Sequence, residues 1–163
     1  MPDLQGVTIR PARFPEDLGA VRGLFRAYAE GLGLDLAFQG FEAELAALPG
    51  KYAPPAGIVL LAGLGDAAIG CIALRPIAVE GQTGCCEMKR LYLGPAARGR
   101  GLGHGLVAAL LTEARRLGYR RMLLDTLRTM TPALALYRAA GFTEIAPYYH
   151  NPLADVVYLG RDL

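Results

Sequence analysis

Hydrophobic positions follow two different spacings along the chain, and each spacing predicts a kind of element. Short runs that are apolar or alternate with polar residues, and that end at turn residues, are typical of β-strands. The chain contains such runs at residues 7–11, 58–62, 68–74, 85–93, 122–125, 142–146 and 156–159. We therefore expect a sheet built mostly from the second half of the chain.

Elsewhere the apolar residues recur every three or four positions, which is typical of amphipathic helices. A first helix opens at Pro15-Glu16-Asp17 and continues past Tyr28. Three others are predicted at residues 41–48, 102–117 and 131–140, and Gly118 and Gly141 end the last two. The stretch 51–57, with two adjacent prolines, is predicted to be a loop.

The order of these elements defines the fold class. A strand and two helices come first, then three strands that read as an antiparallel meander, then helix, strand, helix and two strands. This order predicts a mixed α/β (α+β) fold with one βαβ unit at its centre. A chain of 163 residues is long enough for one core, so residues 1–163 are expected to form a single domain.

Composition and charge exclude several classes of protein. Hydrophobic residues make up 53% of the chain and the net charge is only +2, so neither a disordered chain nor a nucleic-acid partner is expected. Cys71, Cys85 and Cys86 are odd in number and lie in strand-like segments, which favours reduced thiols. The start, residues 1–6, lacks the pattern of a signal peptide, and no apolar run reaches the roughly 20 residues of a membrane span. We expect a soluble cytoplasmic protein that does not enter a membrane.

The segment with the clearest chemistry lies between a strand and an amphipathic helix, and it reads Arg98-Gly99-Arg100-Gly101-Leu102-Gly103. The N-terminus of a helix exposes unpaired N–H groups and the positive end of the helix dipole, so it attracts phosphate oxygens. Glycines let the main chain approach such oxygens closely. A tight strand-to-helix connection would show the same glycines, and spacing alone leaves both interpretations open.

Two common phosphate loops do not fit this segment. No Lys-Ser or Lys-Thr pair follows the glycines, which excludes the P-loop, and the preceding elements are not the repeated βα units of a dinucleotide-binding fold. If the loop binds a pyrophosphate, the ligand is of another kind.

Three segments in the second half of the chain together resemble a known family. They are Glu87-Met88-Lys89-Arg90-Leu91-Tyr92-Leu93, the loop Arg98-x-x-Gly101-x-Gly103, and Leu136-Tyr137-Arg138-Ala139-Ala140-Gly141-Phe142. In order and spacing they are similar to the motifs of the GNAT family of N-acetyltransferases, from about residue 58 to the C-terminus. The resemblance implies a mostly antiparallel mixed sheet flanked by helices, and acetyl-CoA as the acyl donor.

The resemblance also implies where acetyl-CoA binds. The main chain of Leu91, Tyr92 and Leu93 would pair with the pantetheine arm. The pyrophosphate would lie on the loop, next to Arg98 and Arg100 and on the amides of the segment Gly99, Arg100, Gly101, Leu102, Gly103 and His104. Met130 stands where many relatives carry an asparagine, which weakens one expected contact with the pantetheine.

Two catalytic roles follow from the same resemblance. Tyr137 matches the family tyrosine that protonates the departing thiolate, although a tyrosine at this position could also simply pack a helix on the sheet. A phenol, with an ordinary pKa of about 10, is a suitable donor because it is still protonated at neutral pH. Glu87 matches the glutamate base of several relatives, and an ion pair with Lys89 or Arg90 is the alternative.

The acceptor is the least defined part of the prediction. The resemblance implies that residues 14–48 and the loop 146–154 select it, and Tyr28, Tyr148 and Tyr149 could line an apolar amine pocket. We expect a primary amine of a small molecule rather than a protein tail. His104 and His150 are candidates for contacts with phosphate and substrate, although both could be plain surface residues.

Other functions remain open at the level of sequence. A non-catalytic sensor could keep the acyl-CoA pocket and regulate a partner, and a transferase could use another acyl group or an oxygen acceptor. No Cys, His and acid set has the spacing of a zinc site, so no metal is expected. A homodimer through the last strand is possible.

Overall fold

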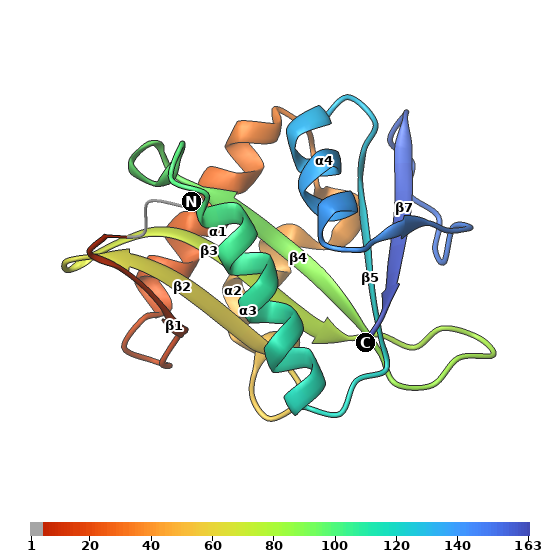
Figure 1. The fold of residues 1–163 in the computed structure, drawn as a ribbon, viewed down its shortest axis with the longest axis horizontal. Helices are drawn as coiled ribbons and strands as arrows, with labels where there is room; N and C mark the ends of the chain where they lie inside the picture. The colour runs from red at the N-terminus through yellow and green to blue at the C-terminus, as the bar shows by residue number, and fades with distance from the viewer. Residues whose placement is uncertain (1–4) are drawn as a thin grey trace.

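A central sheet organises the chain in the computed structural model, which describes residues 5–163 (Figure 1). The sheet has seven strands in the order β1-β2-β3-β4-β5-β7-β6. Their bounds are β1 Val7–Pro11, β2 Ile58–Leu64, β3 Ala67–Pro76, β4 Cys85–Leu93, β5 Arg121–Leu127, β6 Thr143–Glu144 and β7 Val156–Asp162. All neighbouring pairs are antiparallel except β4 and β5, which are parallel.

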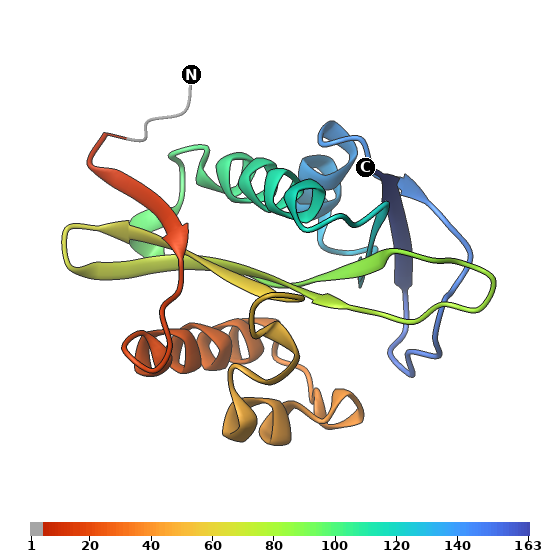
Figure 2. The same cartoon turned by 90° about the horizontal axis from the view of Figure 1, so that it is seen from below.

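Helices cover both faces of this sheet. Helices α1 (Leu18–Leu32) and α2 (Phe41–Ala47) lie on one face, and α3 (Leu102–Arg116) and α4 (Thr131–Ala139) lie on the other (Figure 2). Each face buries its own apolar cluster, one around α3 and one around α1 and α2. Because strands covered on both sides need apolar residues on both sides, β2 and β3 read as nearly continuous apolar runs rather than as alternating ones, whereas β4 carries three buried charged residues.

The parallel pair at the centre is the crossover unit expected from the sequence, and it is short. Helix α3 connects β4 to β5, but the two strands pair only between residues 85–87 and 121–123. A bulge in β4 follows, where Arg90 and Leu91 together face Ile72 of β3, and Arg90 has a φ of 60°. A bulge bends its strand, so β4 and β5 separate beyond this point and open a gap in the sheet.

The order of strands and helices predicted from the sequence is confirmed, with differences at element ends. The helix expected from residue 15 begins at Leu18, and a short 3₁₀ turn, Gly50–Tyr52, occupies part of the expected loop 51–57. The strand expected at 142–146 shortens to Thr143–Glu144. Its first residue, Phe142, instead donates its amide to Tyr137 at the end of α4 and buries its ring against that tyrosine.

Other expectations concern the thiols and the membrane. All three cysteines are free and buried, as expected of reduced core residues. Among the helices of residues 5–163, none is long and apolar enough to cross a membrane. Residues 1–4, which carry most of the segment inspected for a signal peptide, lie outside the described part of the chain.

Candidate active site

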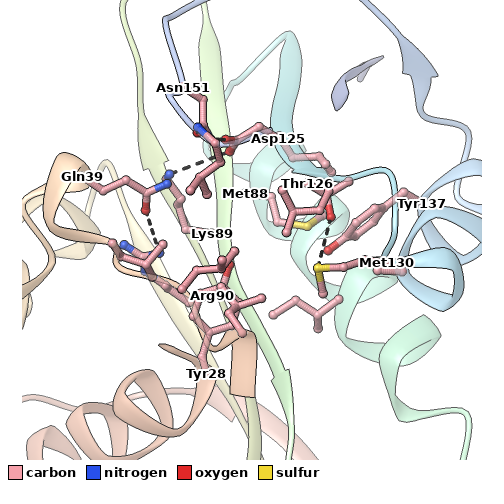
Figure 3. A pocket seen from close by; sticks show the side chains of 18 residues that line it. Tyr28, Gln39, Met88, Lys89, Arg90, Asp125, Thr126, Met130, Tyr137 and Asn151 are labelled. Atoms are coloured by element: carbon pink, nitrogen blue, oxygen red, sulfur yellow. Dashed lines mark hydrogen bonds and ion pairs between the residues drawn. The ribbon is translucent and has the colours of Figure 1, made fainter. Parts of the chain in front are cut away.

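A pocket lies where β4 and β5 separate, and both faces of the sheet contribute to it (Figure 3). Its walls come from α1, the segment 34–39, β4, β5, α4 and the loop 151–153. Segments from the start, the middle and the end of the chain therefore meet at this one opening. We describe it as two halves, a cofactor half on the side of α3 and α4 and an acceptor half on the side of α1 and α2.

The bulge that opens the pocket is held by the side chain of Arg90. Its guanidinium donates to both carboxylate oxygens of Glu44, at 3.0 and 3.1 Å, and to the amide oxygen of Gln39 at 3.0 Å. The rings of Tyr28 and Phe41 lie 5.4 and 5.0 Å from its central carbon. A positive φ costs a residue such as arginine about 1–3 kcal/mol, so these contacts with α1 and α2 stabilise a strained backbone.

The glycine loop directly precedes α3, on the same side of the sheet as the cofactor half, although none of its residues lines the pocket itself. Gly99 and Gly101 have φ of 75° and 71°, and Gly101 is the N-cap residue directly before α3. A Cβ on Gly103 would lie 3.1 Å from the side chain of Leu136, so a larger residue would require that side chain to shift by a few tenths of an ångström where α3 packs near α4. Within the described chain, the amides of residues 99–104 donate no hydrogen bond to protein atoms. Free amides at a helix N-terminus fit a pyrophosphate group.

The end of β4 supplies a second set of free main-chain groups. Leu91, Tyr92 and Leu93 follow the bulge, and on one side Tyr92 and Leu93 pair with β3. On the other side β5 has already moved away, so this edge of β4 has no strand partner in the described part of the chain. The side chain of Arg98 donates to the carbonyl of Leu93 at 3.2 Å and ties the loop to the strand end. An extended chain such as pantetheine can pair with an open edge of this kind.

Tyr137 projects from α4 into the pocket. The residue is only 8% exposed, and its ring packs edge-on against Phe142 at 6.1 Å. No residue of the described chain makes a hydrogen bond with its hydroxyl. Burial raises the pKa of this phenol, and Tyr28 and Asp125 raise it further. Since buried hydroxyl groups almost always have a partner, this protonated phenol is available to a ligand.

Glu87 is buried beside the pocket but does not line it. The side chain is 1% exposed, and its Oε1 accepts from Arg75 at 2.9 and 3.0 Å. Its Oε2 accepts the hydroxyl of Tyr148 at 2.5 Å, and the ammonium of Lys89 lies 3.7 Å from Oε1. The ion pair with Lys89 that the sequence suggested is present, whereas Arg90 pairs with Glu44 instead. The role of Glu87 as a base stays a prediction.

Among the described residues, three charged side chains line the pocket, and Arg90 among them is paired with Glu44. Sequence reasoning missed a role in the site for the other two, Lys89 and Asp125. The Oδ2 of Asp125 accepts the hydroxyl of Tyr149 and the side-chain amide of Asn151, the latter at 2.7 Å. Its Oδ1 lies 4.0 Å from the ammonium of Lys89, and burial lowers the pKa of that lysine. One signal could have found Asp125, because it is a lone acid at the end of an apolar strand run, residues 122–125.

The remaining candidates divide between the pocket and its surroundings. Tyr28 lines the pocket, as suggested, but Tyr148 and Tyr149 stand outside it and use their hydroxyls to hold Glu87 and Asp125. His104 and His150 are exposed. Among the described residues no group of His, Cys, Asp and Glu could hold a metal ion.

Comparison with known proteins agrees with this geometry. Residues 23–142 match the family model described as the acetyltransferase (GNAT) family. The chain is 44% identical to an uncharacterised N-acetyltransferase of Schizosaccharomyces pombe, over 96% of this chain and 95% of that protein. An acetyltransferase of Streptococcus agalactiae has a similar structure, with a TM-score of 0.77 and 21% identity over 98% and 99% of the two chains. A candidate acetyltransferase of Salmonella typhimurium, solved with its cofactor acetyl-CoA, gives a TM-score of 0.68 and 22% identity over 96% and 94%.

Proposed function

This chain belongs to the GNAT family of acetyltransferases, and we propose that it moves an acetyl group from acetyl-CoA directly to a primary amine of a small molecule. Bound acetyl-CoA would supply a thioester whose acetyl group lies in the gap between β4 and β5. The free amides of the segment from Gly99 to His104 would hold the pyrophosphate, with Arg98 and Arg100 nearby. The open edge of Leu91, Tyr92 and Leu93 would hold the pantetheine arm.

Tyr137 is proposed to act as the general acid. As the amine nitrogen forms its bond to the acetyl carbon, the bond from carbon to sulfur breaks and the sulfur needs a proton. The unpartnered phenol of Tyr137 faces the gap and stays protonated because burial raises its pKa. Its hydroxyl can therefore donate that proton, and solvent restores it after products leave.

The acceptor half must take a proton from the amine. An alkyl ammonium, with a pKa of about 10, is mostly protonated at neutral pH, and only the neutral amine can attack. Two carboxylates are close enough to contribute. Glu87 would act through Lys89, which lies between it and the pocket, whereas Asp125 lines the pocket itself.

One observation carries the proposal: a protonated tyrosine without a protein partner in the described chain lines the gap between β4 and β5. The test is isothermal titration with acetyl-CoA, followed by a thiol-release assay with a panel of amines. We expect binding, and thiol release with at least one class of amine. Binding without release on any amine would favour a non-catalytic sensor, and absence of binding would contradict both functions.

A further inference from the structure

The acceptor half contains a buried cation that makes no hydrogen bond. The side chain of Lys89 is 6% exposed, and its ammonium is 3.7 Å from Glu87 and 4.0 Å from Asp125, beyond hydrogen-bond distance. No described residue accepts a hydrogen bond from it. The charge of Glu87 is already balanced by Arg75. Buried charged groups are normally both paired and hydrogen-bonded, so Lys89 has capacity for an anionic partner in the pocket.

Asp125 offers the opposite charge next to this lysine. Its Oδ2 is held by Tyr149 and Asn151, which orient the carboxylate, and its Oδ1 accepts no hydrogen bond from the described chain. In Figure 3 the nitrogen of Lys89 and the carboxylate of Asp125 lie next to each other on the same wall of the pocket. A cation and an anion 4.0 Å apart, each with a free position, are complementary to a ligand that carries both charges on neighbouring atoms.

Apolar side chains form much of the rest of this half, and its other polar lining residues, Gln39, Arg90 and Asn151, are already hydrogen-bonded to Glu44, to each other or to Asp125. Leu32, Leu34, Leu36 and Leu153 line it together with Tyr28. Such a lining favours an apolar group on the ligand, and it gives no partner to additional charges.

We infer that the acceptor is a free α-amino acid with an aliphatic side chain, an inference that rests on the proposed function. Its carboxylate binds the ammonium of Lys89, its amine faces Oδ1 of Asp125, and its side chain packs on the leucines. The substrate ammonium gives one proton to Asp125, and the neutral nitrogen then forms its bond to the acetyl carbon. The bond from that carbon to sulfur breaks, and the sulfur receives the proton of Tyr137. The acylated nitrogen releases its second proton to solvent, and solvent exchange returns a proton to Tyr137 and removes the one on Asp125.

The same charges disfavour other amines. A polyamine or an amino sugar would bring several cations to a pocket that already holds buried Lys89, without an anion for each. A peptide N-terminus carries no carboxylate next to its amine, so it would leave Lys89 without its partner.

The test compares three acceptors of nearly the same shape in the thiol-release assay: leucine, leucinamide and 3-methylbutylamine. The last two lack the carboxylate. A hydrogen-bonded charge pair contributes about ten- to a hundred-fold in binding, so kcat/KM for leucine should exceed that for either analogue by at least about ten-fold. This comparison uses the unmodified protein and does not depend on any variant folding.

Substitution of Lys89 then tests whether this residue causes the preference for leucine. Lys89→Met should raise KM for leucine by at least about ten-fold, and it should reduce the preference for leucine over 3-methylbutylamine in kcat/KM by a similar factor. Acetyl-CoA affinity should be unchanged. Lys51→Met replaces the other lysine of the chain, which is exposed and remote from the pocket, and should alter neither acceptor.

Two results would overturn the inference. One is a kcat/KM for leucinamide or 3-methylbutylamine that equals that for leucine, and the other is an equal loss for all three acceptors in Lys89→Met. Release with polyamines or amino sugars alone would reject the amino-acid acceptor and leave the transferase function standing. Release with no amine at all would instead reject the transferase function.

Discussion

The two halves of the pocket are built in different ways. The cofactor half uses main-chain groups from one stretch of sequence, β4 and the loop up to Gly103, with Tyr137 added from α4. The acceptor half uses side chains from four distant places: the segment 28–39, β4, β5 and the loop 151–153. Its charges are held by further residues outside the pocket, among them Arg75 and Tyr149.

This difference has a physical cause and a consequence for specificity. Main-chain amides at a helix N-terminus point the same way in any protein with that turn, so the pyrophosphate site needs little support. A buried lysine and a buried aspartate keep their charge and direction only if neighbours fix them. The cofactor half should therefore tolerate changes in the acceptor half, and each half can be damaged separately.

The largest effect is expected in the cofactor half. Gly101→Glu puts a side chain at a φ of 71° and a negative charge where phosphate would lie, and the strain alone is about 1–3 kcal/mol. That strain lowers the stability of the fold with or without acetyl-CoA, whereas repulsion between the new carboxylate and the pyrophosphate should lower acetyl-CoA affinity by about 300-fold in isothermal titration. Gly118→Glu is the control, because Gly118 also has a positive φ and lies at the other end of α3. Equal loss in both variants would contradict a pyrophosphate site at the loop.

Tyr137→Phe tests whether the phenol of Tyr137 acts as the general acid in the pocket. Removal of a general acid commonly costs about 100-fold or more, so kcat in the thiol-release assay should fall by about 100-fold. Acetyl-CoA affinity should stay within about two-fold, because the ring still packs on Phe142. An unchanged kcat would leave Tyr137 as a packing residue only.

The pH profile of the unmodified protein checks the same assignment. The pKa of Tyr137 is raised in the folded protein, so its proton is lost only above the ordinary phenol pKa of about 10. Between pH 8 and about 10, ionisation of Tyr137 should therefore cause no decrease in kcat. A decrease that the unmodified protein shows and Tyr137→Phe lacks is not expected in this range. Such a decrease would mean that the phenol ionises within this range.

Glu44→Gln tests a residue that stabilises the acceptor half through Arg90 but takes no part in the proposed reaction. It leaves the buried guanidinium of Arg90 without its carboxylate partner, although Glu44 itself is 13% exposed. The free energy of unfolding should fall by about 2 kcal/mol, measured by urea denaturation. Glu42→Gln is the matched control on α2, since Glu42 is 78% exposed and should contribute less than about 0.5 kcal/mol. Equal stability of the two variants would mean that Arg90 does not depend on Glu44.

The smallest expected effect distinguishes Glu87 from Asp125. Both oxygens of Glu87 are engaged by Arg75 and Tyr148, so Glu87→Gln should lower kcat in the thiol-release assay by less than about ten-fold. Asp125→Asn should lower kcat by about 100-fold. A larger loss in Glu87→Gln than in Asp125→Asn would show instead that Glu87 takes the proton.

The sequence predicted the secondary structure well because local patterns decide it. Apolar periodicity located all seven strands and the four α-helices of residues 5–163, but it missed the three short 3₁₀ helices and some element ends. The strand expected at 142–146 is an example, since Phe142 turns into the core against Tyr137. The bulge at Arg90 was not predicted, because it depends on Glu44 and Gln39, which lie far away in the chain.

The sequence by itself determined the family, the order of elements and the glycine loop, since these depend on short-range spacing and on main-chain groups. Only the tertiary structure decided which charges face the acceptor. It turned Glu87 toward Arg75 and Tyr148, and it brought Lys89 and Asp125 to the pocket. The direction of a buried charge depends on partners supplied by other elements, and no local pattern encodes their position.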